Sequence, residues 1–150
     1  MENMRLLWKI NLILLPLLFI LLLVMPKERI NPKERELMAR LVYLEAGTCS
    51  PECQRAVASI ALNLLDGGKW GDSIEEVIYC RNVFSVAGLL EDCTPSEEAY
   101  DAVDYIIKHG RTLPKKVRYF RSDYDHPWEG YKNYTVIDNV YFGYFTNGNH

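Results

Sequence analysis

The sequence lacks the motifs that identify several common enzyme chemistries. It contains no glycine-rich phosphate-binding loop, no His-Glu-x-x-His helix and no Gly-x-Ser-x-Gly nucleophile elbow. These absences set aside the usual nucleotide-binding, zinc-protease and serine-hydrolase sites. The chain also has no internal repeat and no low-complexity segment, and its net charge of −3 provides no basic field for nucleic acid. We therefore expect no nucleic-acid partner, and the sequence leaves the oligomeric state undefined.

Histidine and cysteine are scarce, which limits both metal sites and thiol chemistry. The chain has three histidines and four cysteines, and the cysteines form two pairs with short separations, Cys49 with Cys53 and Cys80 with Cys93. All four lie after the hydrophobic N-terminal run described below, which indicates export to an oxidising compartment where disulfides form. Two local disulfides are therefore our first expectation among the three possible connectivities. Zinc is the competing interpretation, but the chain has no Cys-x-x-Cys pair, and we predict no metal and no cofactor.

One long hydrophobic run lies near the N-terminus. Residues 10–25 are almost wholly apolar, and counted from Leu6 the run reaches about 20 residues, near the length that spans a bilayer. The residues that follow lack the small-x-small pattern that signal peptidase recognises, so we predict an uncleaved membrane anchor over residues 1–30, with a cleaved signal segment as the alternative. In either case residues 31–150 are predicted to be an exported domain, tethered by the N-terminal helix or secreted after cleavage.

Residues 31–150 combine helical patterns with a few strands. Capping residues followed by apolar positions at helical spacing predict helices over 32–46, from 51 to about 67, over 74–79, and from the N-cap Thr94 to about 109. Runs of β-branched and aromatic residues predict strands over 117–121, 134–137 and 140–145, the last two joined by a tight turn at Asp138-Asn139. Helices followed by a small antiparallel sheet indicate an α+β domain.

Glu45 occupies a position on the first predicted helix where a carboxylate is unusual. Leu37, Leu41 and Glu45 are spaced four residues apart, so the carboxylate continues an apolar stripe and is expected to face inward. Burial and the negative end of the helix dipole would both raise the pKa of Glu45. A carboxyl group that holds its proton near neutral pH can serve as a general acid. A buried glutamate paired with an arginine or with backbone amides fits the same periodicity, which leaves both interpretations open.

Aromatic and hydroxyl side chains supply candidates for binding a substrate. Phe84 and Ser85 lie in a loop bounded by cysteines, a position typical of segments that line a cleft. The chain also contains ten tyrosines and three tryptophans, whose faces stack on sugar rings as well as on one another. Ser85, Tyr119 and Gln54 are candidates for orienting a sugar or the acid, with a packing or capping role as the alternative for each.

Several of these segments together resemble the spore cortex-lytic cell-wall hydrolase family. The segments are Leu41-Val42-Tyr43-Leu44-Glu45-Ala46, Gln54, the run from Val57 to Asn63, and Phe84-Ser85, and the similarity extends from about Glu36 to Phe142. The resemblance implies a fold similar to lysozyme-like transglycosylases, peptidoglycan glycan strands as the substrate, and Glu45 as the essential acid. The chain departs from the family pattern at Leu64, where arginine is usual, in the segment Thr48 to Cys53, and near residue 140, where a histidine is absent. These departures bear on which form of peptidoglycan is the substrate, that of the spore cortex or that of the vegetative wall.

The function that the resemblance implies is cleavage of the β-1,4 bond between N-acetylmuramic acid and N-acetylglucosamine. In a lytic transglycosylase Glu45 would act alone, first as acid and then as base. A lysozyme-type muramidase normally uses a second carboxylate, and the residues available for that role are Asp72, Glu75, Asp92, Asp123 and Asp125. The non-enzymatic alternative is a module that binds the cell wall or assists lysis without cleaving the glycan.

Overall fold

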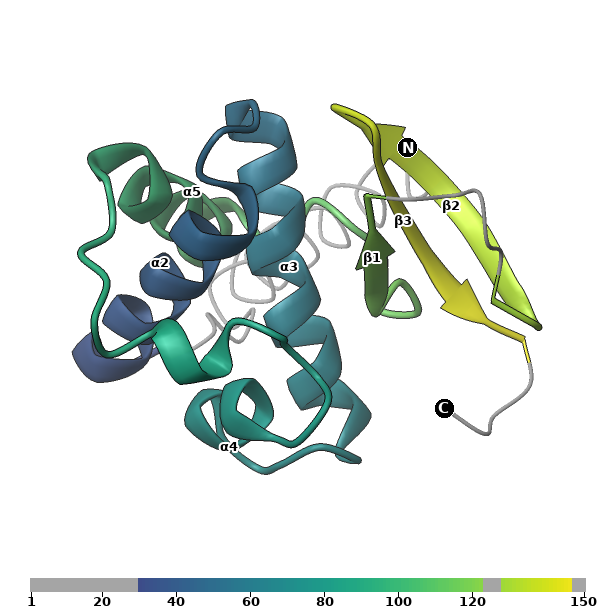
Figure 1. Ribbon diagram of the computed structural model, residues 1–150, viewed down its shortest axis with the longest axis horizontal. Coiled ribbons are helices and arrows are strands. Elements are labelled where there is room, and N and C mark those ends of the chain that lie inside the picture. The colour runs from purple at the N-terminus through teal and green to yellow at the C-terminus, as the bar shows by residue number, and fades with distance from the viewer. Residues whose placement is uncertain (1–29, 123–127, 147–150) are drawn as a thin grey trace, which may run out of the picture.

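The computed structural model describes residues 30–122 and 128–146. This part of the chain contains four α-helices, a single 3₁₀ turn and three strands. They are α2 (Pro32–Ala46), α3 (Pro51–Gly67), α4 (Ile74–Tyr79), η1 (Ala87–Leu89), α5 (Glu97–His109), β1 (Tyr119–Arg121), β2 (Tyr131–Ile137) and β3 (Val140–Phe145). The helices gather on one side and the sheet lies on the other, with α3 between them (Figure 1). The predicted α+β class is confirmed for the described residues.

The predicted membrane anchor, residues 1–30, lies outside the described residues except for its last position. Within residues 30–122 and 128–146, no helix has the length and apolar character needed to cross a bilayer.

Side-chain caps determine where the helices begin. The Asn31 side chain accepts a hydrogen bond from the Glu34 amide at 2.9 Å, and the Glu34 carboxylate accepts one from the Asn31 amide at 3.0 Å. These two reciprocal bonds form a capping box at the start of α2. The prediction that Thr94 caps the last long helix was wrong. The Ser96 hydroxyl accepts from the Ala99 amide, so α5 begins at Glu97. Ser96 offers the same capping chemistry as Thr94 but lies closer to the first buried residue of the helix.

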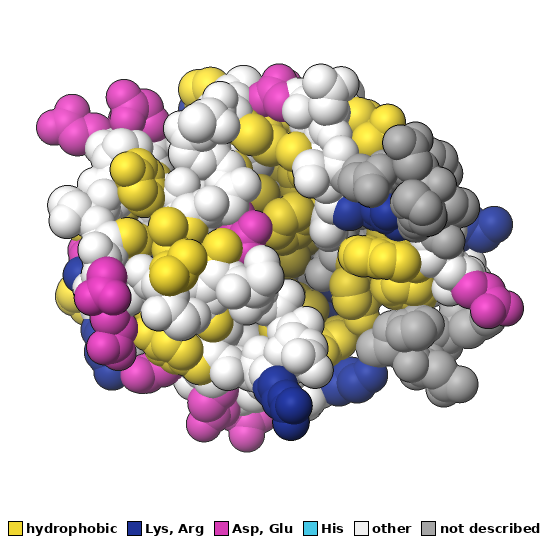
Figure 2. All heavy atoms as spheres, in the orientation of Figure 1, with side chains coloured by type: hydrophobic (Ala, Val, Ile, Leu, Met, Phe, Trp, Pro, Cys, Tyr) yellow, Lys and Arg dark blue, Asp and Glu magenta, His cyan; other side chains and the backbone are white. Residues whose placement is uncertain are grey.

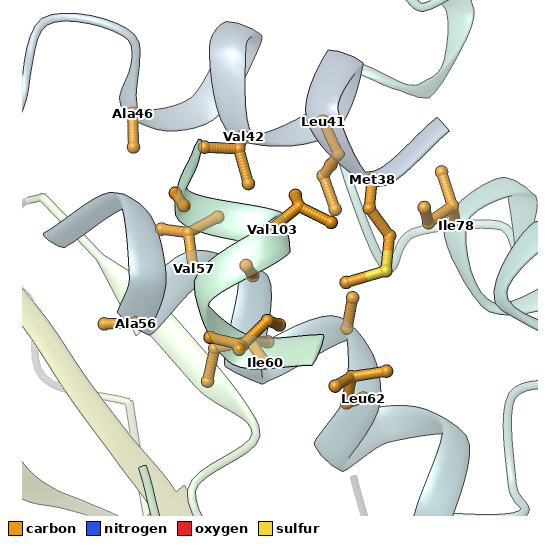
Figure 3. Close-up of a cluster of buried hydrophobic side chains, with 14 of the residues drawn as sticks. Met38, Leu41, Val42, Ala46, Ala56, Val57, Ile60, Leu62, Ile78 and Val103 are labelled. Atoms are coloured by element: carbon orange, nitrogen blue, oxygen red, sulfur yellow. The ribbon is translucent and has the colours of Figure 1, made fainter. Parts of the chain in front are cut away.

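Helix α3 forms the centre of the hydrophobic core. Of its 17 residues, 11 are buried, so it is covered by neighbours over most of its circumference. Figure 3 shows side chains of α3 meeting those of α2 and α5, among them Val57 and Ile60 from α3, Leu41 and Val42 from α2, and Val103 from α5. Full burial of one such aliphatic side chain stabilises the fold by about 1.5–3 kcal/mol. This cluster is therefore the main source of stability in the helical part.

The sheet is antiparallel with the strand order β1-β3-β2. Its first strand is shorter than predicted, and β2 begins at Tyr131, three residues before the predicted start. Asp138 and Asn139 have φ values of 51° and 63°, the left-handed conformations that a two-residue type I′ hairpin requires, which confirms the predicted turn. Phe142 in the central strand is fully buried and attaches the sheet to the helical core.

The predicted disulfides are not formed, because all four cysteines are free in the structure. The sulfur atoms of Cys49 and Cys53 belong to a cluster whose members lie within 4.8 Å of one another, whereas disulfide sulfurs are about 2.05 Å apart. The thiols of the other pair face different backbone acceptors. The Cys93 thiol donates to the Leu90 carbonyl at 3.4 Å, and the Cys80 thiol points to the Arg81 carbonyl at 4.0 Å.

Asn63 joins the helical core to the segment that leads into the sheet. Its side chain is fully buried on α3, and its Nδ2 donates to the carbonyls of Pro114 at 2.9 Å and Val117 at 2.7 Å. Its Oδ1 accepts a hydrogen bond from Arg111 at 3.0 Å. The Arg118 Nε donates to the Asn63 backbone carbonyl at 3.2 Å. Because buried polar groups require partners, these bonds fix residues 111–118 against α3 and thereby position β1.

Replacing Asn63 tests this junction. Asn63→Ala removes the side-chain donor to the buried Val117 carbonyl, whereas the Pro114 carbonyl still accepts from the Val117 amide. One unsatisfied buried group costs about 1–3 kcal/mol, so we expect the free energy of unfolding to fall by about that amount. Equilibrium denaturation of the 150-residue chain measures the change. Asn133→Ala, which truncates an exposed asparagine on β2, is the matched control and should have little effect. Equal losses in the two variants would show that the Asn63 hydrogen bonds do not hold the junction.

Candidate active site

A cleft with a volume of about 1160 Å³ opens between the helical part and the sheet. Its walls come from the C-terminal end of α2, one face of α3, the loop over residues 81–85, the start of β1, and residues 128, 129 and 145. Figure 2 shows this hollow, with hydrophobic side chains along it and an acidic side chain at its edge. The cleft is therefore mainly apolar and aromatic, with a few polar groups that can orient a ligand.

Glu45 lies on the cleft wall, one residue before the end of α2. No described residue forms a hydrogen bond or an ion pair with its carboxylate, and the last turn of α2 contains no basic residue. Burial raises the pKa of Glu45 above the ordinary value for glutamic acid, because the charged form loses hydration there. Within the described residues the alternative of a glutamate paired with arginine or backbone amides has no support. The site therefore presents a carboxyl group suited to donating a proton.

Three of the other predicted residues also lie at the cleft, namely Phe84, Ser85 and Tyr119. Phe84 is only 6% exposed and packs against Phe120 at a ring-centroid distance of 6.5 Å, so it mainly supports the loop. Its neighbour Ser85 is exposed and can offer its hydroxyl to a ligand. Burial raises the pKa of Tyr119, which keeps its hydroxyl protonated and available as a hydrogen-bond donor.

Gln54 lies apart from the other four predicted site residues. It is 3% exposed, it does not line the cleft, and its Nε2 donates to the Cys49 carbonyl at 3.2 Å. Its Oε1 is buried and has no hydrogen-bond partner among the described residues. The observed contact of Gln54 thus stabilises the connection between α2 and α3.

Further aromatic residues of the cleft were not among the predicted site residues. Trp70 contacts the Tyr119 ring edge-on at 6.3 Å, and Trp128 stacks on Phe145 at 6.0 Å with an interplanar angle of 19°. Arg121 lies 4.6 Å above the ring of Trp128. Trp128 belongs to the aromatic segment between the predicted strands. The composition of that segment does not tell which of its aromatic residues line a cleft and which are packed in the interior. Only the sheet topology brings residues 119, 128 and 145 together.

A second carboxylate at the cleft was also missed. Glu129 lines it, whereas Asp72, Glu75 and Asp92 do not, and Glu75 instead pairs with Lys33 at 2.9 Å. The remaining two acidic candidates, at 123 and 125, lie outside the described residues. Glu129 directly follows Trp128, so its proximity to an aromatic residue was the one available signal in the sequence.

Comparison with solved structures identifies two chains with the same fold. The catalytic domain of the SleB protein of Bacillus cereus matches with a TM-score of 0.68 and 22% sequence identity, over 77% of this chain and 93% of that one. The catalytic domain of SleB from Bacillus anthracis, described as a germination-specific lytic transglycosylase, matches with a TM-score of 0.67 and 21% identity, over 77% and 98%. A search of curated proteins finds no significant match.

A family model provides the sequence-level comparison. The model for cell wall hydrolases matches residues 50–143, which is more than half of the 150-residue chain. The matched range begins after Glu45, so it covers the loop and sheet walls of the cleft but does not include the carboxylate on α2. The range and the SleB-like fold agree with the resemblance found in the sequence. The chain belongs to the cell wall hydrolase family.

Proposed function

We propose that this protein cleaves the glycan strands of peptidoglycan and that Glu45 is its general acid. The observation that carries the proposal is a half-buried carboxyl group with no partner among the described residues, placed on the wall of an aromatic cleft. Membership of the cell wall hydrolase family supports peptidoglycan as the substrate, and it implies action outside the cytoplasm. The similarity in fold to a lytic transglycosylase supports the class of reaction.

The proposed reaction breaks the β-1,4 bond between N-acetylmuramic acid and N-acetylglucosamine. Protonated Glu45 gives its proton to the bridging oxygen as the bond from that oxygen to C1 of the muramyl residue breaks. The Glu45 carboxylate then accepts the proton of the muramyl C6 hydroxyl while that oxygen bonds to C1. The product is a 1,6-anhydro end, and no water is consumed. Glu45 returns to its protonated form, so this route needs no second carboxylate and no metal ion.

The remaining cleft residues are proposed to bind and orient the strand. Sugar rings present apolar faces that stack on aromatic side chains, and Trp128 and Phe145 already form a stacked pair at the cleft. The Ser85 and Tyr119 hydroxyls can exchange hydrogen bonds with sugar hydroxyl or acetamido groups. Arg81 and Arg118 also line the cleft and add positive charge to its wall. Tight positioning of the bond near the acid is a large part of what such a site contributes to the rate.

A lysozyme-type muramidase is the second candidate, and the position of Glu129 favours it. In that reaction water attacks C1 and a second carboxylate assists as base or nucleophile. Glu129 lines the same cleft as Glu45, and among the described residues it is the other acidic side chain that does so. The two candidates share Glu45 as acid and differ in the chemical end that they leave on the glycan.

The proposed cellular arrangement follows from the N-terminal segment. Residues 1–30 would anchor the chain in the membrane and place residues 31–150 on the cell-wall side, or the domain would be secreted if that segment is cleaved. Both arrangements bring the cleft to its substrate.

Substitution of Glu45 tests the role of the acid. Glu45→Gln keeps the shape of the side chain but removes the transferable proton, so release of soluble glycan from purified sacculi should fall by at least about 10²-fold. Glu91→Gln removes the same charge from an exposed site outside the cleft and should retain the wild-type rate. Activity of Glu45→Gln close to that of Glu91→Gln would refute the assignment. Wild-type protein that binds sacculi yet releases nothing would instead point to a wall-binding module.

The pH dependence tests the environment of Glu45. Its pKa is raised by burial, and the protonated form is the one that starts the reaction. At low substrate concentration the rate should therefore remain high above about pH 4.3, the ordinary value for glutamic acid, and fall only as the pH rises through the elevated pKa. Initial rates on soluble glycan fragments across the pH range provide the measurement. A rate that already declines through the ordinary value would contradict the burial argument.

A further inference from the structure

Two cysteines and an aspartate meet at the corner between α2 and α3, outside the residues that line the cleft. Cys49 lies in the connection after α2, Cys53 in the first turn of α3, and Asp138 in the turn between β2 and β3. The two sulfur atoms and a carboxylate oxygen lie within 4.8 Å of one another. Figure 1 shows this hairpin turn beside the N-terminal end of α3. Two potential ligands from the α2–α3 connection and one from the distant β2–β3 turn thus converge on one point.

Backbone contacts hold each of the three residues in place. The Asp138 Oδ2 accepts a hydrogen bond from the Ser50 amide at 2.6 Å, and the type I′ turn fixes its backbone at a φ of 51°. The Cys49 amide donates to the Ala46 carbonyl at 3.0 Å, and the Cys49 carbonyl accepts from Gln54. The cluster is therefore organised before any ligand binds.

The chemistry of the three side chains indicates which metal ion they would bind. Thiolate sulfur and carboxylate oxygen are both ligands that Zn²⁺ binds in proteins, at distances of about 2.3 Å to sulfur and about 2.0–2.2 Å to oxygen. In a tetrahedral site these distances place the ligand atoms about 3.5–4 Å apart, so small side-chain rotations bring the observed cluster to that size. Sulfur ligands disfavour Mg²⁺ and Ca²⁺, which bind oxygen.

Without a cation the Cys53 thiol keeps its proton, so a metal ion would have to displace that proton on binding. Burial raises the pKa of Cys53 to about 12, and the neighbouring Cys49 and Asp138 add to the effect. Each of these groups opposes negative charge on the others while no cation is present. A divalent ion reverses that balance, since a coordinating thiol is deprotonated by the metal it binds.

We propose that Cys49, Cys53 and Asp138 form a Zn²⁺ site that clamps the β2–β3 turn to the α2–α3 corner. Three protein ligands leave the fourth tetrahedral position for water. Glu45 lies four residues before Cys49, and α2 ends at Ala46 between them, so the ion would fix the chain just after the helix that carries the acid. The ion lies outside the cleft lining and takes no part in the acid catalysis proposed above, so either inference can fail without the other.

The test uses the 150-residue chain, reduced, stripped of metal with a chelator and kept free of oxygen. Titration with Zn²⁺ should load a single ion per chain, raise the melting temperature, and protect Cys49, the more accessible thiol of the pair, from alkylation as mapped by mass spectrometry. Cys80 and Cys93 should stay reactive and act as internal controls. Binding to a folded state stabilises it in proportion to the logarithm of ligand concentration, which the melting curves can follow.

Two variants decide the question, because Cys53 is buried and its replacement could prevent folding. Cys49→Ser removes one ligand, and Asp138→Asn keeps an acceptor for the Ser50 amide but removes the charge. Each should weaken Zn²⁺ binding at least about tenfold, the low end of the loss seen when even an indirect partner of a ligand is removed. The Cys80→Ser/Cys93→Ser double variant should bind as the wild type does. No Zn²⁺ uptake, undiminished uptake by Cys49→Ser, or a Cys49–Cys53 disulfide in the purified chain would overturn the proposal.

Discussion

The burial of α3 is the constraint on which the rest of the structure depends. Its aliphatic side chains meet those of α2 and α5 in the core, and two residues of its remaining face, Ile60 and Leu64, form part of the cleft wall. On the same helix, the fully buried Asn63 binds the segment that leads into β1. One helix therefore determines where the core lies, where the sheet attaches and what surface a substrate meets. Its packing density makes that arrangement rigid.

Glu45 gains its chemical character from this arrangement. The packing of α2 against α3 carries the carboxyl group to the edge of an apolar wall, where burial raises its pKa and no described residue neutralises it. An ionised carboxylate at such a position lowers stability, since its charge loses hydration without gaining a partner. Proteins retain arrangements of this kind mainly at functional sites. The assignment of Glu45 as the acid therefore rests on its burial and its place on the cleft wall, since the range matched by the family model begins after it.

Local features were predictable from the sequence, and features assembled by tertiary contacts were not. Helix starts at Asn31 and Ser50 and the hairpin turn at Asp138-Asn139 depend on side chains within a few residues, so their positions follow from local chemistry. The placement of Glu129 at the cleft depends on how β2 pairs with β3. The disulfide prediction failed for a similar reason, because spacing in sequence does not determine the direction in which each thiol points. Thr94 and Ser96 can both cap a helix, and the tertiary packing of the buried face of α5 determines that the helix begins after Ser96.

The central claim is that a single carboxyl group cleaves the glycan by internal attack. Mass spectrometry of the soluble products released from peptidoglycan by the wild-type protein tests it most directly. The account predicts muropeptides lighter by one water than their reducing-end counterparts, since the C6 hydroxyl replaces water as the nucleophile. Products with ordinary reducing ends would contradict this mechanism, indicate a water-using hydrolase, and make Glu129 the first residue to replace in the search for a second carboxylate.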